Sequence, residues 1–156
     1  MRLFEEVFVS FTFAGEVAAM AAALKVLDVL EQTDALARME AQGRMLRDGV
    51  NALARQAGLP ERVECVGRPT WSLLRFRDAA GKDSYLERSL FSQEAVKRGV
   101  LILVTHNMTA AHDGPSTERT LEAYSGVFKT LAGWLSDRDP AAHLEGAMIQ
   151  PVFRVR

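Results

Sequence analysis

Apolar residues recur on two sides of one predicted helix over positions 16–31. The main stripe recurs at helical spacing, which places its residues on one helix face: Val17, Met20, Ala21, Leu24, Leu27 and Leu30. Val26 and Val29 form a second apolar flank, and the run 18–23 is rich in alanine. A helix that is apolar almost all round is buried. We therefore expect this helix in a protein core or at a subunit interface.

A second helix is predicted over 34–57. Thr33 and Asp34 are typical of an N-cap, while Gly58 and Pro60 end the pattern. The apolar positions alternate spacings of three and four: Leu36, Met39, Gly43, Leu46, Val50 and Leu53. This stripe is too short for a coiled coil, so we interpret it as a face that packs on a core.

Two strands and a third helix follow. Residues 62–66 and 71–77 are rich in β-branched, aromatic and alternating apolar positions, which predicts strands. Ser84 with Glu87 three residues later is a capping-box signature. Gly99 then marks the end of that helix.

The last third of the chain contains one more predicted strand and one more helix. Residues 100–104 form a continuous apolar run, which predicts a strand covered on both faces. Residues 105–115 are interpreted as a polar loop. Ser116 is expected to cap a fourth helix with a clear apolar stripe, and 136–150 to form a surface tail.

The order of predicted elements is helix, helix, strand, strand, helix, strand, helix. It favours an α+β fold in which helices cover one face of a small, mainly antiparallel sheet. Residues 3–13 precede this fold and are apolar with two acids. We interpret them as an extended segment that packs against a part of the protein outside this sequence.

Composition narrows the functional classes. The chain has 156 residues, 48% of them hydrophobic and 25% charged, which is typical of a soluble globular domain. The net charge of -1 gives no field that would attract nucleic acid or an anionic membrane. A single cysteine excludes an internal disulfide framework, and the acidic N-terminal residues do not resemble a signal peptide. We expect a cytoplasmic protein that binds neither nucleic acid nor membranes.

Few residues form a recognisable catalytic or metal site. His106 and His112 lie six apart with Asp113 beside the second, but a zinc site needs three or four ligands. Polar residues of a solvated or hydrogen-bonded loop are the favoured interpretation, and metal binding is the lesser one. Cys65 has no neighbouring base in sequence, so we interpret it as a small buried residue rather than a nucleophile.

Arg75 and Arg77 alternate along one predicted strand. Two guanidinium groups on one face could hold a carboxylate, but a solvated face is the favoured interpretation. The sequence contains no Walker loop, nucleophile elbow, paired cysteine motif or dinucleotide fingerprint.

Residues 10–16 join hydroxyl and glycine residues to the start of the first helix. The Thr12 hydroxyl and nearby backbone N–H groups could hold a phosphate at such a helix start. An ordinary N-cap explains the same residues. Spacing alone favours the cap and leaves the phosphate site open.

The segment 8–16 and the Ala-rich helix after it resemble class III pyridoxal-phosphate aminotransferases. Within that family the resemblance is strongest to glutamate-1-semialdehyde aminomutase and its relatives. In that family a Gly-Thr-containing segment leads into an Ala-rich helix. Further stretches agree with the family in the same order: 93–100, 106–112, 120–124 and 150–156. The resemblance spans nearly the whole chain.

The resemblance implies the C-terminal part of a longer enzyme, with residues 1–13 a connection from a missing large domain and 14–156 a small domain of fold type I. The lysine that holds pyridoxal phosphate belongs to the missing part. None of Lys25, Lys82, Lys97 and Lys129 matches the family's lysine motif. The isolated chain is therefore expected to be inactive, and the full enzyme to be a homodimer.

The resemblance also implies a cofactor contact. The matching threonine is Thr12, which with the backbone of Phe11 and Phe13 would reach the cofactor phosphate of a neighbouring subunit. Two departures from the family pattern are Phe11, where a small residue is usual, and Glu16, where an asparagine is usual. Arg68 is a candidate for the substrate-carboxylate arginine by position alone.

Two hypotheses follow. In the first, the chain is the C-terminal small domain of an aminotransferase or aminomutase. In the second, it is a self-contained, non-catalytic α+β module that associates through the Ala-rich helix.

Overall fold

The computed structural model describes residues 12, 13 and 15–151. They belong to two compact units, 1–36 and 37–156, and each unit is described by itself. Most of the predicted extended segment 3–13 lies outside the described residues, and the predicted domain boundary at residue 13 stays a prediction. Within the described residues, no helix combines the length and hydropathy needed to cross a bilayer.

The first unit contains the helix α1, Val17–Gln32, which has no buried residue. Large apolar side chains are exposed along it: Val17, Met20, Leu24, Val26, Leu27 and Val29. The predicted core position is therefore wrong for this unit. A helix that is apolar on every side needs neighbours on every side, and among its described residues this unit has one helix. The subunit-interface alternative stays a prediction.

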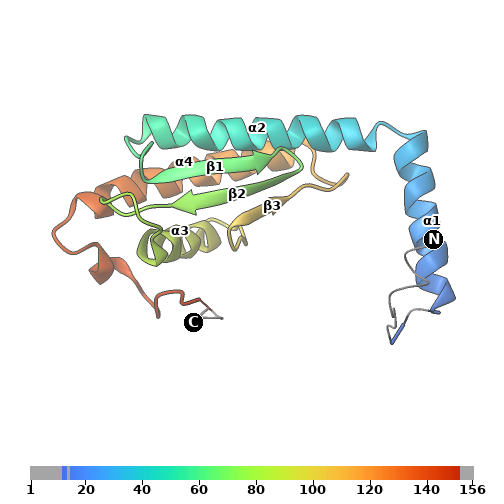
Figure 1. Cartoon of the computed structure of the whole chain (residues 1–156). Coiled ribbons are helices and arrows are strands. Elements are labelled where there is room, and N and C mark those ends of the chain that lie inside the picture. The colour runs from blue at the N-terminus through green and yellow to red at the C-terminus, as the bar shows by residue number, and fades with distance from the viewer. Residues whose placement is uncertain (1–11, 14, 152–156) are drawn as a thin grey trace. The chain divides into compact units, whose positions relative to one another are not determined.

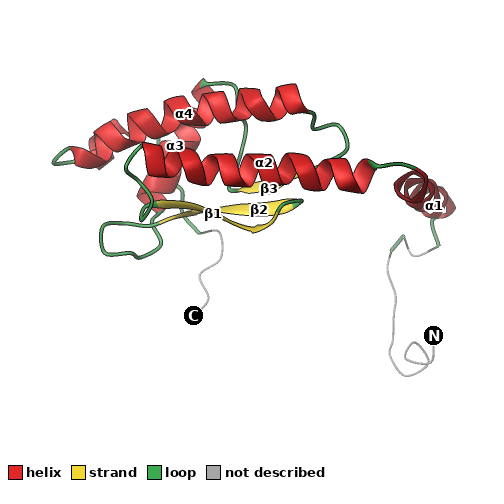
Figure 2. Ribbon diagram, turned by 90° about the horizontal axis from the view of Figure 1, so that it is seen from above, coloured by secondary structure: helices red, strands yellow, loops and turns green. Residues whose placement is uncertain are grey.

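The second unit has the predicted order of elements and confirms the α+β fold class (Figure 1). Its elements are α2 (Ala35–Gln56, which begins just before the unit), β1 (Val63–Arg68), β2 (Trp71–Phe76), α3 (Tyr85–Lys97), β3 (Thr105–Asn107), α4 (Gly114–Ser136) and the 3-10 helix η2 (Pro140–His143). The strands form one antiparallel sheet in the order β1-β2-β3. Figure 2 shows α2, α3 and α4 on one side of this sheet.

The core lies between the sheet and the helices. Ser72, Leu74 and Phe76 of β2 are buried, whereas Trp71 and Leu73 are exposed, because successive strand residues point to opposite faces. The buried helix residues that meet this face include Val50, Leu90, Phe91, Tyr124, Phe128 and Leu131. The open face therefore carries apolar side chains outward.

The predicted strand 100–104 is wrong. The side chains of Leu101 and Leu103 are 90% and 75% exposed, and the strand begins at Thr105, inside the predicted loop. Backbone pairing between β2 and the segment before β3 extends only as far as the Leu74 N–H, which donates to the Val104 carbonyl at 2.8 Å. Further along that edge, the Phe76 carbonyl accepts the Ser84 N–H at 2.9 Å instead. The start of α3 thus occupies the edge that this run would need.

The cap of α4 is Asp113 rather than the predicted Ser116. The Asp113 carboxylate accepts the Ser116 N–H at 2.8 Å, and the Ser116 hydroxyl oxygen accepts the Asp113 N–H at 3.0 Å. The hydrogen bond from Ser116 lowers the pKa of Asp113. The two polar residues form a reciprocal capping box, so the helix begins three residues earlier than expected.

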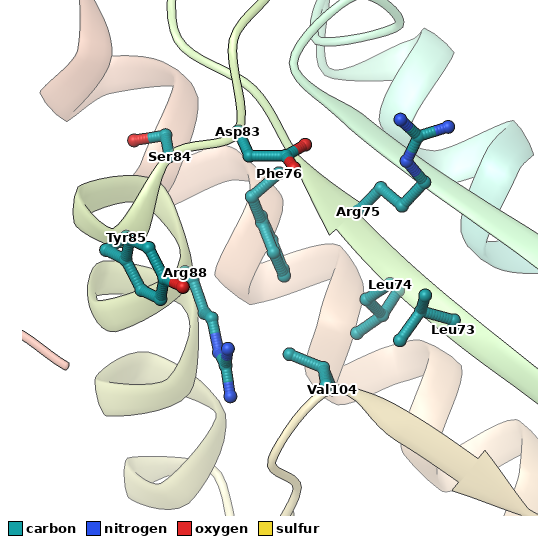
Figure 3. Close-up of a pocket in the computed structure, with 9 residues that line it drawn as sticks. All are labelled: Leu73, Leu74, Arg75, Phe76, Asp83, Ser84, Tyr85, Arg88 and Val104. Atoms are coloured by element: carbon teal, nitrogen blue, oxygen red, sulfur yellow. The ribbon is translucent and has the colours of Figure 1, made fainter. Parts of the chain in front are cut away.

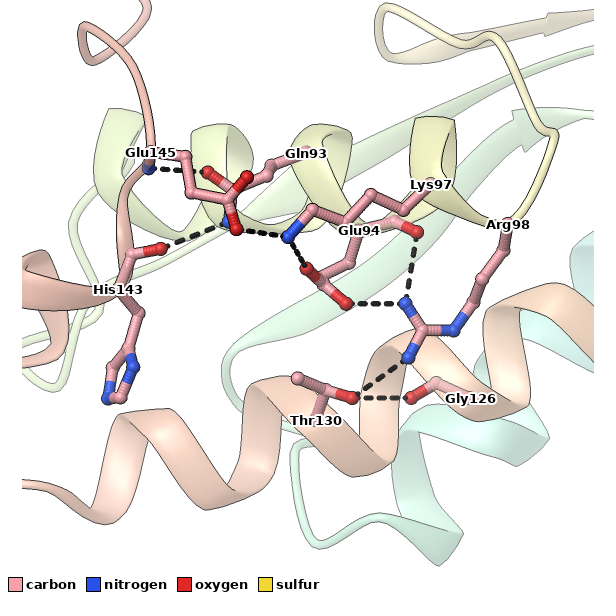
Figure 4. A network of polar contacts seen from close by, with 8 residues as sticks. All are labelled: Gln93, Glu94, Lys97, Arg98, Gly126, Thr130, His143 and Glu145. Carbon is pink, nitrogen blue, oxygen red and sulfur yellow. Dashed lines mark hydrogen bonds and ion pairs between the residues drawn. The ribbon is translucent and has the colours of Figure 1, made fainter.

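The predicted surface tail at 136–150 is tied to α3 (Figure 4). The Gln93 side chain donates to the His143 carbonyl at 3.0 Å and accepts the Glu145 N–H at 2.9 Å. The His143 ring stacks on Trp134 with centroids 4.7 Å apart. One glutamine on α3 therefore fixes the chain on both sides of Leu144.

Candidate functional site

The predicted cofactor contact lies in a turn before α1. Thr12 and Phe13 are exposed, and the Glu16 N–H closes the turn on the Phe13 carbonyl at 3.0 Å. Phe11 lies outside the described residues. The predicted contact of these residues with a phosphate stays a prediction.

Glu16 is the N-cap of α1. Its carboxylate accepts the backbone N–H of Ala18 at 2.9 Å and that of Ala19 at 2.5 Å. A bound anion would need such free N–H groups at the helix start. In this chain a side-chain carboxylate occupies two of them, so the geometry of the helix start is that of an ordinary cap.

A buried polar cluster joins β1, β2, β3 and α4. The two ring nitrogens of His106 face the Ser72 hydroxyl and the Tyr124 hydroxyl, each at 3.0 Å. The Cys65 sulfur lies 3.9 Å from Nδ1 of the same ring. Four side chains that are far apart in sequence thus meet on the buried face of the sheet.

This cluster is electrically neutral at neutral pH. Burial lowers the pKa of His106 to about 4, and burial raises the pKa of Cys65 and of Tyr124. A thiol with a raised pKa and an imidazole with a lowered one do not form an activated nucleophile. The prediction that Cys65 is a small buried residue is confirmed.

His106 and His112 line one pocket of about 410 Å³ between α4 and the segment 99–108. His106 is a buried strand residue, so its predicted place in a loop is wrong. His112 is an exposed loop residue whose Nδ1 accepts the Thr109 N–H at 2.9 Å. Among the described residues, no group of three or more His, Cys, Asp or Glu side chains is arranged to hold a metal.

The contact between His106 and Tyr124 was not predicted. Both residues belong to stretches with other predicted roles, a polar loop and an apolar helix stripe. The only sequence signal is a tyrosine on an otherwise apolar helix face, since a buried tyrosine hydroxyl needs a polar partner.

The arginines do not combine into a carboxylate site at the predicted positions. Arg77 pairs with Glu64, with Nη2 and Oε2 3.0 Å apart. Arg75 is exposed on the open face of β2. Arg68 is exposed at the end of β1, where it pairs in register with Trp71.

The lysines of this chain do not fit the residue that holds pyridoxal phosphate. Lys25, Lys82 and Lys129 are exposed. The Lys97 ammonium contacts Glu145 and lies 3.0 Å from Glu94 Oε1, and the hydrogen bond to Glu145 raises the pKa of Lys97. Covalent attachment of the cofactor needs a neutral amine, and these contacts favour the charged one.

Two solved structures share this fold. The FumI protein of Sphingopyxis sp. MTA144, solved in its PLP internal aldimine form, is 26% identical and matches 88% of this chain and 33% of its own, with a TM-score of 0.72. An omega-transaminase from Sphaerobacter thermophilus is 17% identical and matches 62% of this chain and 24% of its own, with a TM-score of 0.53. No family model matches the sequence.

The chain therefore shares the fold of one part of each of these two proteins. It spans about a third of the FumI chain and about a quarter of the omega-transaminase chain. The helices and the small antiparallel sheet of this chain form the α+β arrangement expected from the sequence.

Proposed function

We propose that this chain is the C-terminal small-domain part of a class III aminotransferase or aminomutase, related to the glutamate-1-semialdehyde aminomutase group. The observation that supports this proposal is the match of 88% of the chain to FumI with a TM-score of 0.72. The full enzyme transfers an amino group between an amino donor and a carbonyl compound. Pyridoxal phosphate supplies the electron sink for that chemistry.

In this proposal the catalytic lysine comes from a large domain outside this sequence. The present chain contributes Thr12, which contacts the cofactor phosphate of a neighbouring subunit in a homodimer. The exposed α1 and the open face of the sheet then lie against other parts of the enzyme. The isolated chain is not a catalyst.

Sequencing the coding DNA upstream of Met1 in all three frames tests the proposal. The expected result is a reading frame for a large domain that contains a lysine motif. Expression of that longer chain should give a protein that binds pyridoxal phosphate and exchanges amino groups between donor and acceptor. An upstream region without such a domain would refute the assignment.

A second test uses the chain alone. The chain is mixed with pyridoxal phosphate, reduced with borohydride and digested for mass spectrometry. The expected result is no stoichiometric modification of any single lysine, because none of the four is buried. Complete modification of one lysine would contradict the claim that the missing domain supplies this residue.

The alternative is a self-contained, non-catalytic α+β module that associates through α1. The observation that favours it is the core of the second unit, which is assembled from β1, β2 and all three of its long helices. Such a module needs no large domain. A promoter and ribosome-binding site directly before Met1, with no upstream reading frame, would support it.

A further inference from the structure

A pocket of about 220 Å³ lies between β2 and the first turns of α3. Val104 borders it where the pairing of β3 with β2 ends, and Ser84 borders it where α3 begins. The pocket therefore lies along the stretch of the β2 edge that β3 leaves uncovered. Its walls are mainly apolar, with side chains from Leu73, Leu74, Phe76 and Val104.

Arg88 of α3 is the cation at one side of this pocket. Figure 3 shows its side chain running from α3 toward Val104, whereas Arg75 points away toward the far side of β2. The Nε atom of Arg88 is buried and has no hydrogen-bond partner among the described residues. The guanidinium lies 6.0 Å from the centre of the Tyr85 ring.

Two acids close to Arg88 in sequence form no ion pair with it within the described part of the chain. The neighbouring Glu87 is buried and pairs with Arg62. Asp83 lines the pocket but lies away from the Arg88 guanidinium (Figure 3). A buried donor without a partner costs free energy in the folded state. The Arg88 side chain as a whole is only partly buried, and no ion pair holds it among the described residues.

We propose that this pocket binds a carboxylate group attached to a short hydrocarbon chain. Arg88 donates hydrogen bonds to the two carboxylate oxygens, which match the planar fork of a guanidinium. The hydrocarbon part packs on Leu74, Phe76 and Val104. An engineered cavity of about 150 Å³ holds benzene, so this pocket has room for a ligand slightly larger than that. Asp83 at the other end disfavours a second carboxylate.

Nothing in this proposal depends on the aminotransferase assignment. It concerns only residues of the second unit, and it adds a binding site that the proposed function does not use. The carboxylate has two possible sources, a free small molecule or a Glu or Asp side chain of a polypeptide segment. Both offer the same chemistry to Arg88.

The first experiment titrates the full 156-residue chain with butyrate and with butyramide, its uncharged counterpart, and follows backbone amide shifts by NMR. Butyrate should give saturable shifts at 73–76 and 85–88, and butyramide should give none. Arg88→Gln should weaken butyrate binding about tenfold, as expected for loss of a hydrogen bond to a charged group. Arg88→Lys should retain part of the affinity.

Arg55→Gln is the matched control, because Arg55 is an exposed cation in the last turn of α2, outside the pocket lining. It should leave butyrate binding unchanged. A second titration uses a capped peptide with one glutamate between two leucines, and its glutamine counterpart. Tighter binding of the glutamate peptide than of butyrate identifies a polypeptide as the source, and the reverse order identifies a free carboxylate.

The proposal is overturned if neither carboxylate probe gives saturable shifts at about 100 mM. Equal shifts with butyrate and butyramide would also overturn it, as would equal affinity of Arg88→Gln and the unmodified chain. Each amide spectrum reports whether the variant is folded, so a folding defect is not mistaken for loss of the site.

Discussion

The hydroxyl of Tyr124 lies 3.0 Å from Nε2 of His106, and both side chains are buried. This contact joins α4 to β3 across the core. It is a hydrogen bond between two neutral groups that are largely buried. Removing the Tyr124 hydroxyl leaves Nε2 of His106 unpaired, although Nδ1 keeps its contact with the Ser72 hydroxyl, and removing His106 leaves the Tyr124 hydroxyl without this partner.

Tyr124→Phe should lower the free energy of unfolding by about 1–2 kcal/mol, because it leaves Nε2 of His106 buried and unpaired. Urea denaturation followed by circular dichroism measures the loss. Tyr85→Phe is the matched control, since the Tyr85 side chain is 37% exposed, and it should change the midpoint far less. Equal effects of the two substitutions would contradict a role for the buried hydrogen bond.

Stability should fall as the pH drops from about 6.5 to about 4. Burial lowers the pKa of His106 from 6.5 to about 4 in the folded chain, so in this range the unfolded chain binds a proton that the folded chain does not. The loss between about pH 7 and about pH 5 is roughly 2 kcal/mol. Urea midpoints across this range measure it.

His106→Asn should remove most of this slope between about pH 7 and about pH 5, whatever its effect at one pH. Carboxylates such as Glu94, whose pKa is lowered in the folded chain, also contribute stability to the folded chain that is lost in acid. They do so in both proteins, so the difference between the two slopes isolates His106. Identical slopes would show that His106 does not titrate as its burial requires.

Glu94 is the centre of the network that connects α3 to α4 (Figure 4). Its Oε2 lies 2.5 Å from Arg98 Nη1, and Arg98 Nη2 donates to the Thr130 hydroxyl at 3.1 Å. Burial alone would raise the pKa of Glu94, but hydrogen bonds from Arg98 and Lys97 outweigh it and the pKa is lowered.

Glu94→Gln should lower the free energy of unfolding by about 1–2 kcal/mol, because it removes the buried charge that pairs with Lys97 and Arg98. The loss is not larger because both cations remain partly in water. Thermal and urea denaturation measure the change. Glu145→Gln removes the other, exposed partner of Lys97 and should have a much smaller effect. The prediction is wrong if the exposed substitution costs as much as the buried one.

The order of elements was predictable because each helix shows its own apolar period and most have cap residues. The third strand was not, because its position depends on the Ser84 N–H occupying the Phe76 carbonyl. A continuous apolar run such as 100–104 does not reveal that its partner edge is taken. Its exposed leucines therefore looked like core residues.

The candidate site was less predictable than the fold. The sequence identified Thr12 and Glu16 as neighbours of a helix start. It did not show which group accepts hydrogen bonds from the N–H groups there. It placed Cys65 in the core correctly but could not show that Ser72, His106 and Tyr124 meet it there. Contacts between residues on different elements depend on tertiary packing, which local spacing does not encode.

Glu16→Ala should expose the first turn of α1 to solvent exchange. The carboxylate accepts the N–H groups of Ala18 and Ala19, so its removal should speed hydrogen exchange at those two amides several-fold. Amide exchange followed by NMR measures this. Glu31→Ala, at the other end of α1, is the control and should leave both rates unchanged. Unchanged rates in Glu16→Ala would show that the cap does not form.

The isolated chain should self-associate through α1. Leu24 and Leu27 are 65% and 55% exposed, and contiguous apolar surface of this kind is covered in most stable proteins. Sedimentation equilibrium should show a mass that rises with concentration. Replacing both leucines with glutamate should shift the chain toward monomer without reducing its folded circular dichroism signal.

Lys25→Glu is the control for that experiment, because it changes the charge of the same helix turn by two units and leaves the apolar surface in place. It should weaken association much less than the double substitution. If the unmodified chain is a monomer at every concentration, self-association through α1 is wrong. Equal effects of Lys25→Glu and the double leucine substitution would instead assign the association to charge rather than to apolar contact.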